Sequence, residues 1–152
     1  MSEAAVSIAR AGLADLDALV PLFDAYRVFY QQPSDPALAR TYLEKRLGAG
    51  EYVGFLARDG AGKAVGFAMV SQTFSSVGLK RIWLLNDIFV DPSTRRTGAG
   101  AALMEAVEAF ARETEAGRLD LFTARTNLTA QSVYKRAGWV EDVAFLRFQK
   151  KL

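Results

Sequence analysis

The spacing of apolar residues along the chain predicts helices in several long segments. Leu16, Leu19 and Phe23 belong to a set that recurs every three to four residues, which predicts a first helix. Ser34-Asp35-Pro36 is a typical helix start, and the helix it predicts ends at about Leu47, before two glycines. Two further helices are predicted later in the chain. The predicted helices cover residues 14–30, 34–47, 98–115 and 129–137.

Shorter apolar segments between the helices predict strands. The sequence Asp-Gly-Ala-Gly-Lys at residues 59–63 joins two of them as a hairpin. Residues 82–90 are apolar apart from Asn86 and Asp87, so we expect this strand to be buried on both faces of a sheet. The predicted strands cover residues 6–10, 52–58, 64–73, 82–90, 118–123, 139–141 and 143–150. The resulting order, βααβββαβαββ, indicates an α/β fold with a mixed central sheet flanked by helices.

Length and composition set the broad class of the protein. A chain of 152 residues with 51% hydrophobic and 24% charged residues is typical of one globular domain, so we expect a single domain over residues 1–152. The net charge of +2 gives no electrostatic case for nucleic acid as a partner. No apolar run is long enough to predict a membrane span, and the first ten residues do not resemble a signal peptide. We therefore expect a cytoplasmic protein.

The chain contains no cysteine and no histidine, and this restricts its chemistry. Disulfides, thiol nucleophiles, Ser-His-Asp triads and histidine-based zinc sites are all excluded, and we expect no metal. If the protein is an enzyme, its acid and base must be carboxylates, tyrosine, lysine, water or backbone groups. Such a set favours a reaction driven largely by the positioning of the reactants.

A cationic loop with two glycines precedes the long helix predicted at 98–115. It reads Arg95-Arg96-Thr97-Gly98-Ala99-Gly100 and follows the apolar strand at 82–90. Glycine lets the backbone approach an anion closely, and the first N–H groups of a helix favour negative charge. The arginines can add charge-assisted hydrogen bonds. The loop is therefore a candidate site for a phosphate group.

Three other interpretations of this loop fit less well. A dinucleotide-binding motif requires a third glycine at position 103, where Leu103 stands. The lysine-bearing phosphate loop requires Gly-Lys-Ser/Thr, which does not occur in the chain. An ordinary strand-to-helix turn with surface arginines remains the structural alternative, and calorimetry with ATP, NAD and acetyl-CoA would identify the ligand.

The second half of the chain resembles the GCN5-related N-acetyltransferase (GNAT) superfamily. The loop matches the family signature Arg/Gln-x-x-Gly-x-Gly/Ala. The segment from Asn127 through Tyr134 to Gly138 and Trp139 resembles the family element Asn-x-x-Ala-x-x-x-Tyr-x-x-x-Gly-Phe, with tryptophan in place of phenylalanine. The first half is similar, more loosely, to a branch that includes yeast histone and polyamine acetyltransferases, at residues 22–30 and in the strand LLNDIFV.

The resemblance implies acetyl-CoA as the donor and coenzyme A as a product. It implies that the pyrophosphate is held by the loop and the first turn of the helix, and the pantetheine arm by backbone groups of the preceding strand. The cofactor-binding residues that the resemblance implies are Ile88, Phe89, Val90, Arg95, Arg96, Thr97, Gly98, Ala99, Gly100, Ala101, Asn127 and Tyr134. Among these, Phe89 is expected to pack between the two backbone contacts at Ile88 and Val90.

Two residues are candidates for the catalytic acid and base. By resemblance, Tyr134 donates a proton to the leaving thiolate, and a neutral phenol suits that role chemically. Asp87 is the candidate base, because its apolar neighbours can raise the pKa of a carboxyl group toward neutrality. Each residue also has a purely structural interpretation: Tyr134 could be an aromatic residue of the core, and Asp87 could be a carboxylate that only pairs with a cation. Asn127 can cap the following helix as well as contact the coenzyme.

We therefore predict an N-acetyltransferase that moves an acetyl group from acetyl-CoA to a primary amine by direct attack, through a tetrahedral intermediate. The alternative is a non-catalytic module with the same fold that senses acyl-CoA. The acceptor is a small-molecule or peptide amine, neither nucleic acid nor membrane is an expected partner, and a homodimer is expected. Substrate-binding candidates are Tyr26, Tyr30, Trp83 and Asn86, because aromatic rings beside a carboxylate suit a cationic amine.

Overall fold

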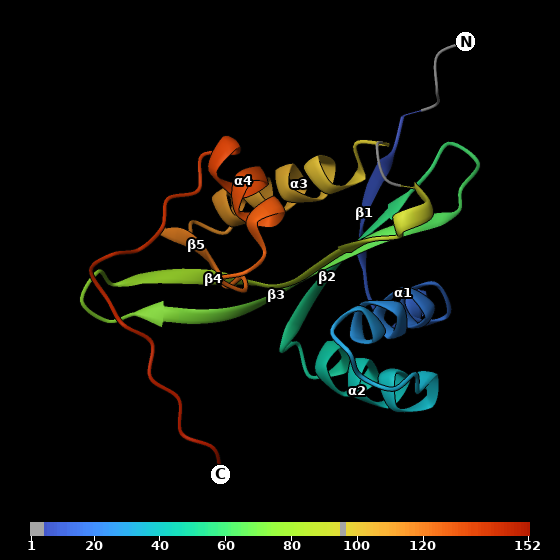
Figure 1. Ribbon diagram of the computed structural model, residues 1–152, viewed down its shortest axis with the longest axis horizontal. Coiled ribbons are helices and arrows are strands. Elements are labelled where there is room, and N and C mark those ends of the chain that lie inside the picture. Colours follow the sequence, from blue (N-terminus) through green and yellow to red (C-terminus); the bar gives the residue numbers. More distant parts are fainter. Residues whose placement is uncertain (1–4, 95–96) are drawn as a thin grey trace. The chain divides into compact units, whose positions relative to one another are not determined.

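The computed structural model describes residues 5–94 and 97–152, and these divide into a first unit up to Leu121 and a second from Phe122 to Leu152 (Figure 1). The helices are α1 (Leu16–Phe29), α2 (Pro36–Gly48), α3 (Ala99–Glu113) and α4 (Leu128–Arg136). The strands are β1 (Ser7–Ala11), β2 (Tyr52–Arg58), β3 (Ala64–Ser75), β4 (Lys80–Val90) and β5 (Arg118–Leu121). Single 3-10 turns at Leu13–Asp15 and Pro92–Thr94 precede α1 and follow β4.

The first unit is built on a five-stranded sheet in the order β1-β2-β3-β4-β5. The first four strands pair antiparallel, and β5 pairs parallel to β4. The start of α2 follows the prediction, because Asp35 caps it by accepting a hydrogen bond of 3.1 Å from the Leu38 N–H, with Pro36 in the first turn. The predicted mixed α/β fold is confirmed.

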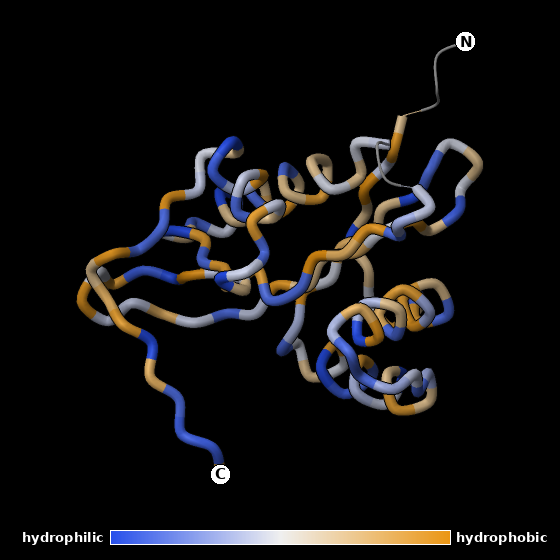
Figure 2. Tube along the Cα trace, viewed as in Figure 1, coloured by the Kyte–Doolittle hydropathy of each residue, from blue (hydrophilic) through white to orange (hydrophobic). Residues whose placement is uncertain are grey.

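Helices cover both faces of this sheet: α1 and α2 lie on one side and α3 on the other (Figure 1). Neighbouring residues of β2 show the two faces, because Phe55 packs on Phe110 of α3 while Leu56 belongs to the core against α1. Phe67 of β3 is fully buried and packs on α1. Figure 2 shows apolar residues in the central strands of the sheet and in the helices that cover it.

The second unit contains α4 followed by an extended segment. The predicted strands at 139–141 and 143–150 are wrong, because this segment forms no ladder with any strand that the structure describes. Its apolar side chains remain in solvent, with Val143 92% and Phe145 81% exposed. Apolar residues in a short segment favour a strand only where a partner strand supplies hydrogen bonds and a surface to pack on. Among the residues that the structure describes, this segment has no such partner.

Within residues 5–94 and 97–152, no helix is both long and apolar enough to cross a membrane.

Candidate functional site

A bulge in β4 shapes the candidate site. Met69 of β3 pairs with Asp87, but the next residue, Val70, pairs with Leu85, so Asn86 is an extra residue in β4. Side chains alternate between the faces of a regular strand, and an extra residue reverses this alternation. As a result, odd-numbered residues after the bulge face α1, whereas Trp83 before the bulge faces α3.

Asp87 is buried, and each of its two carboxylate oxygens accepts a hydrogen bond. Its side chain is 9% exposed, and it accepts one hydrogen bond from the Tyr26 hydroxyl (2.9 Å) and one from the Asn86 amide (3.1 Å). Burial raises the pKa of the Asp87 carboxyl, and the hydrogen bonds from Asn86 and Tyr26 oppose that rise. The structure thus brings together Tyr26, Asn86 and Asp87, three residues that were predicted from the sequence to serve the acceptor side of the reaction.

An aromatic cluster from the end of α1 surrounds Tyr26. The ring of Tyr30 meets that of Tyr26 edge to face at 5.1 Å, and Phe89 of β4 packs on Tyr26 at 6.0 Å. Phe29 adds a further contact to Phe89. Burial and the neighbouring Asp87 carboxylate raise the pKa of the Tyr26 hydroxyl well above its ordinary value, so this phenol stays neutral and donates.

Trp83, the remaining substrate-binding candidate, is not brought to this group. It is 6% exposed, packs on Phe110 at 4.9 Å, and donates a hydrogen bond of 2.8 Å from Nε1 to the Thr114 hydroxyl. It lies on the α3 side of the sheet, because the bulge at Asn86 separates it from Asp87. Its contacts are those of a core residue.

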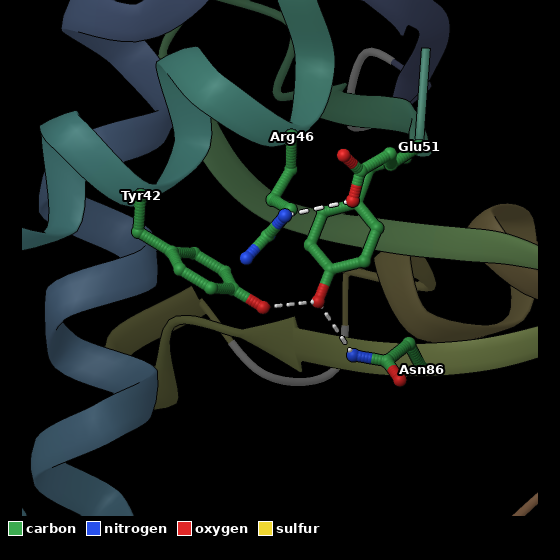
Figure 3. A network of polar contacts seen from close by, with 5 residues as sticks. Tyr42, Arg46, Glu51 and Asn86 are labelled. Atoms are coloured by element: carbon green, nitrogen blue, oxygen red, sulfur yellow. Dashed lines mark hydrogen bonds and ion pairs between the residues drawn. The ribbon is translucent and has the colours of Figure 1, made fainter. Parts of the chain in front are cut away.

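Two tyrosines that sequence reasoning missed extend the polar group around Asp87 (Figure 3). The Tyr52 oxygen accepts a hydrogen bond of 3.1 Å from the Asn86 amide and lies 2.6 Å from the Tyr42 oxygen. Beside them, Arg46 forms an ion pair with Glu51 at 2.7 Å, and Figure 3 shows it next to Tyr42. The spacing of these residues in the sequence gives no sign of the group, because they come from α2, the start of β2 and the bulge of β4.

The ladder between β4 and β5 is short. It pairs Ile82–Leu85 with Arg118–Leu121, and β5 ends there. From the bulge to Val90, β4 therefore has β3 on one side and no described strand on the other.

In the last part of β4, the backbone N–H and C=O groups of successive residues point alternately toward β3 and away from it. The N–H of Asp91 donates to the Val65 carbonyl at 2.8 Å, so these opposite residues form a hydrogen-bonded pair. In an antiparallel ladder such pairs alternate with pairs whose N–H and C=O groups point outward. Ile88 and Val90 are the outward residues, and Phe89 between them bonds to β3. The backbone groups predicted to meet the pantetheine arm thus face the side of β4 that has no described strand.

The glycine loop leads into α3. Gly98 is the N-cap residue, with φ +81°, a left-handed conformation that glycine adopts without strain. The first N–H bonded within the helix is that of Ala102, to the Gly98 carbonyl at 3.0 Å, and the Thr97 hydroxyl lies 3.4 Å from the Ala99 N–H. The first turn thus presents N–H groups that the helix itself does not use. Arg95 and Arg96 lie outside the described residues.

This first turn lies beside the end of β4. A Cβ added at Gly100 would meet the Val90 side chain at 3.8 Å, an ordinary contact. The helix start at 97–101 and the outward backbone of β4 are therefore neighbours within the first unit.

The remaining two candidates lie in the second unit. Asn127 is the N-cap of α4, and its side chain accepts a hydrogen bond of 3.1 Å from the Ala130 N–H, which confirms the predicted cap. Tyr134 lies in the last turn of α4, half-buried, with its ring 6.2 Å from that of Trp139. Gly138, with φ +94°, ends the helix as predicted.

No group of three or more histidine, cysteine, aspartate or glutamate side chains placed to hold a metal occurs among the described residues.

Comparison with known proteins gives the class of protein. The chain matches the acetyltransferase (GNAT) family over residues 18–139 and belongs to it. It is 40% identical to the uncharacterized N-acetyltransferase YhfO of Bacillus subtilis, over 94% of this chain and 95% of that protein. The crystal structure of a probable acetyltransferase superposes with a TM-score of 0.91 at 39% identity, over 96% of this chain and 97% of that one.

A more distant structure shares the fold alone. The aminoglycoside N-acetyltransferase AAC(6')-Iy in complex with CoA superposes with a TM-score of 0.78 at 23% identity, over 99% of this chain and 98% of that one. Together the family and its relatives confirm the N-acetyltransferase predicted from the sequence, and they do not favour the alternative of a non-catalytic module.

Proposed function

We propose that this enzyme binds acetyl-CoA and transfers its acetyl group directly to a primary amine. The observation that supports this most is the juxtaposition, within the first unit, of the α3 N-terminus with the outward backbone of β4. The helix N-terminus suits a pyrophosphate, and the extended edge suits the amide groups of a pantetheine arm. A fold neighbour, AAC(6')-Iy, has been crystallised with CoA, which supports the same ligand here.

The proposed coenzyme contacts follow from these elements. Residues 97–101 and the arginines at 95 and 96 hold the pyrophosphate, and Ile88 and Val90 bond the pantetheine arm. Asn127 adds a contact from its side-chain amide. The outward N–H of Ile88 is also the proposed donor to the thioester oxygen, where negative charge develops as the amine attacks.

The proposed chemistry is direct aminolysis of the thioester. Asp87, directly or through water, takes a proton from the substrate ammonium, and the nitrogen lone pair then attacks the carbonyl carbon. The carbonyl π electrons move to oxygen and form a tetrahedral intermediate. Its collapse restores the carbonyl and breaks the C–S bond, Tyr134 gives its proton to the thiolate, and the former amine nitrogen loses its second proton to solvent and becomes the neutral amide. Coenzyme A leaves as the thiol, and solvent returns a proton to Tyr134 and removes one from Asp87.

The acceptor is proposed to be a small-molecule or peptide amine bound beside α1. Tyr26, Tyr30 and Asn86 lie next to Asp87 and suit an amine that is cationic when it arrives. Trp83 is left out, because it packs against α3. A single catalytic domain over residues 1–152, a homodimer and a cytoplasmic location remain predictions.

The function is tested by release of free thiol from acetyl-CoA in the presence of a panel of amines. The panel contains polyamines, aminoglycosides, amino acids and peptides with a free N-terminus or lysine. We expect amine-dependent thiol release with at least one class, and an acetylated product of the matching mass. Tight binding of acetyl-CoA with no turnover on any class would instead favour the non-catalytic module.

Replacement of Asp87 by asparagine tests the base. A base must be unprotonated to act, so kcat/KM of the parent enzyme should fall as the pH drops through the pKa of Asp87. Since burial raises that pKa, the fall should occur above the usual range of an aspartate. Asp87→Asn should remove this fall of kcat/KM at low pH, the acidic limb of the pH profile, or shift it to another pH. Asp120→Asn, on β5 and paired with Arg118, is the control and should keep it. Superimposable profiles of Asp87→Asn and the parent enzyme would show that Asp87 is not the base.

A further inference from the structure

The polar group around Asp87 continues beyond the residues that touch its carboxylate. The amide nitrogen of Asn86 has two hydrogens, and its two acceptors are Asp87 at 3.1 Å and the Tyr52 oxygen at 3.1 Å. Tyr52 is in turn 2.6 Å from the Tyr42 oxygen, as Figure 3 shows. Asn86 thus lies between the candidate base and a pair of phenols.

We propose that Tyr52 is a positioning residue for the catalytic base, acting through the side-chain amide of Asn86. The inference rests on the proposed role of Asp87. Tyr52 does not touch Asp87, and its part is to keep the Asn86 amide turned so that an N–H, and not the amide oxygen, faces the carboxylate. The proposal gives Tyr52, a residue of β2 that belongs to no sequence motif, a role in the reaction.

The bulge makes this arrangement possible. In a regular strand, residues 86 and 87 would point to opposite faces, and the Asn86 amide would not reach its neighbour's carboxylate on the substrate side. The extra residue at Asn86 allows the two consecutive side chains to bond each other. An exposed asparagine has several staggered rotamers, so a second partner is needed to hold one of them.

Tyr52 is well placed to be that partner, because it is itself held. Its ring meets that of Tyr42 at 5.9 Å in an edge-to-face contact, and the two oxygens are in close hydrogen-bond contact. The Arg46 guanidinium lies 5.3 Å from the centroid of the Tyr42 ring and pairs with Glu51. Burial raises the pKa of the Tyr52 hydroxyl, so it remains a neutral acceptor for the amide.

The charged and titratable groups around Asp87 and Tyr52 come from several elements. They are Tyr26 and Tyr30 of α1, Tyr42 and Arg46 of α2, Glu51 before β2, and Tyr52 of β2. On β3, the residue opposite Asp87 is the uncharged Met69. Only Arg46 among these is a cation, and it is paired with Glu51, so the carboxylate depends on neutral donors for its stabilisation. Loss of one such donor should raise the pKa of Asp87 further.

The experiment compares Tyr52→Phe with Tyr42→Phe in the full chain. Both changes remove one hydroxyl and keep the ring, but only Tyr52→Phe removes one of the two acceptors of the Asn86 amide. The pKa of Asp87 is measured by the 13C NMR titration of its carboxyl group, and kcat/KM is measured against pH. We expect Tyr52→Phe to raise the Asp87 pKa by about one unit, equivalent to a tenfold change, and Tyr42→Phe to raise it less. The acidic limb of kcat/KM should move by the same amount.

The two measurements separate this inference from the proposed function. An Asp87 titration that moves in Asn86→Ala but not in Tyr52→Phe would overturn the role of Tyr52. An Asp87 titration that moves in Tyr52→Phe while the activity profile stays in place would support the positioning and overturn Asp87 as the base. Thermal unfolding of each variant shows that the comparison is made on folded protein.

Discussion

Tyr134→Phe is expected to lower kcat by roughly 10- to 1000-fold, as for the loss of a general acid, with little change in KM for acetyl-CoA. Without the phenol, the tetrahedral intermediate must expel a thiolate with no proton donor in place. The ring contact with Trp139 at 6.2 Å does not need the hydroxyl, so the helix should keep its fold. Steady-state and single-turnover kinetics with a saturating amine measure the effect.

Ser132→Ala provides the matched control. Ser132 lies on the same helix, its side chain is exposed, and the change also removes one hydroxyl. It should leave kcat unaltered. An acyl donor whose leaving thiolate is less basic needs less help from an acid. The fall in kcat caused by Tyr134→Phe should therefore be smaller with such a donor. An unchanged kcat in Tyr134→Phe with acetyl-CoA would remove the residue from the mechanism.

The motif around Tyr134 was predictable from sequence because its residues act locally. Asn127 caps the start of α4 through the Ala130 N–H. At the other end, the Gly138 N–H bonds the Lys135 carbonyl, and the Trp139 N–H bonds the Tyr134 carbonyl at 3.0 Å. This is the Schellman arrangement, which requires a left-handed residue and often adds an apolar contact, here between Trp139 and Tyr134. Short-range geometry of this kind follows from residue spacing alone.

Strand register was not predictable in the same way. The nearly continuous apolar run indicated a buried strand at 82–90, but nothing in it marked Asn86 as the extra residue of a bulge. Trp83 was therefore grouped with Asp87 although the bulge sends the two side chains to opposite faces. Tyr52 was missed for the same reason, because its contact with Asn86 spans 34 positions of the sequence. The pairing of distant strands decides such contacts.

The C-terminal strands illustrate a further limit of sequence patterns. Residues 143–150 are rich in apolar residues, as a strand would be, yet side chains such as Phe148, at 86% exposure, remain in solvent. A strand exists only with a partner, and the sequence of a segment does not contain its partner. The looser likeness of the first half to yeast histone and polyamine acetyltransferases stays a prediction.

Introducing an acidic residue at Gly98 is expected to weaken acetyl-CoA binding strongly. With φ +81°, most side chains would strain the backbone here, but asparagine and aspartate tolerate this conformation. A Cβ at Gly98 would meet nothing within 4 Å, so the protein itself has room for either. Gly98→Asp and Gly98→Asn therefore differ in charge and hardly in shape. This isosteric pair separates charge from strain better than the larger Gly98→Glu.

The expected difference between the two variants follows from electrostatics. A carboxylate about 5 Å from one phosphate charge costs about 3 kcal/mol at an effective dielectric constant of about 20, and solvent exposure reduces this. We expect Gly98→Asp to bind acetyl-CoA roughly 10- to 100-fold more weakly than Gly98→Asn, with the gap narrowing at high salt. Gly50→Asp, at φ +70° with equal space, adds the same charge on the turn before β2 and should bind as the parent enzyme does. Equal affinities of Gly98→Asp and Gly98→Asn by calorimetry would mean that the α3 N-terminus does not hold the pyrophosphate.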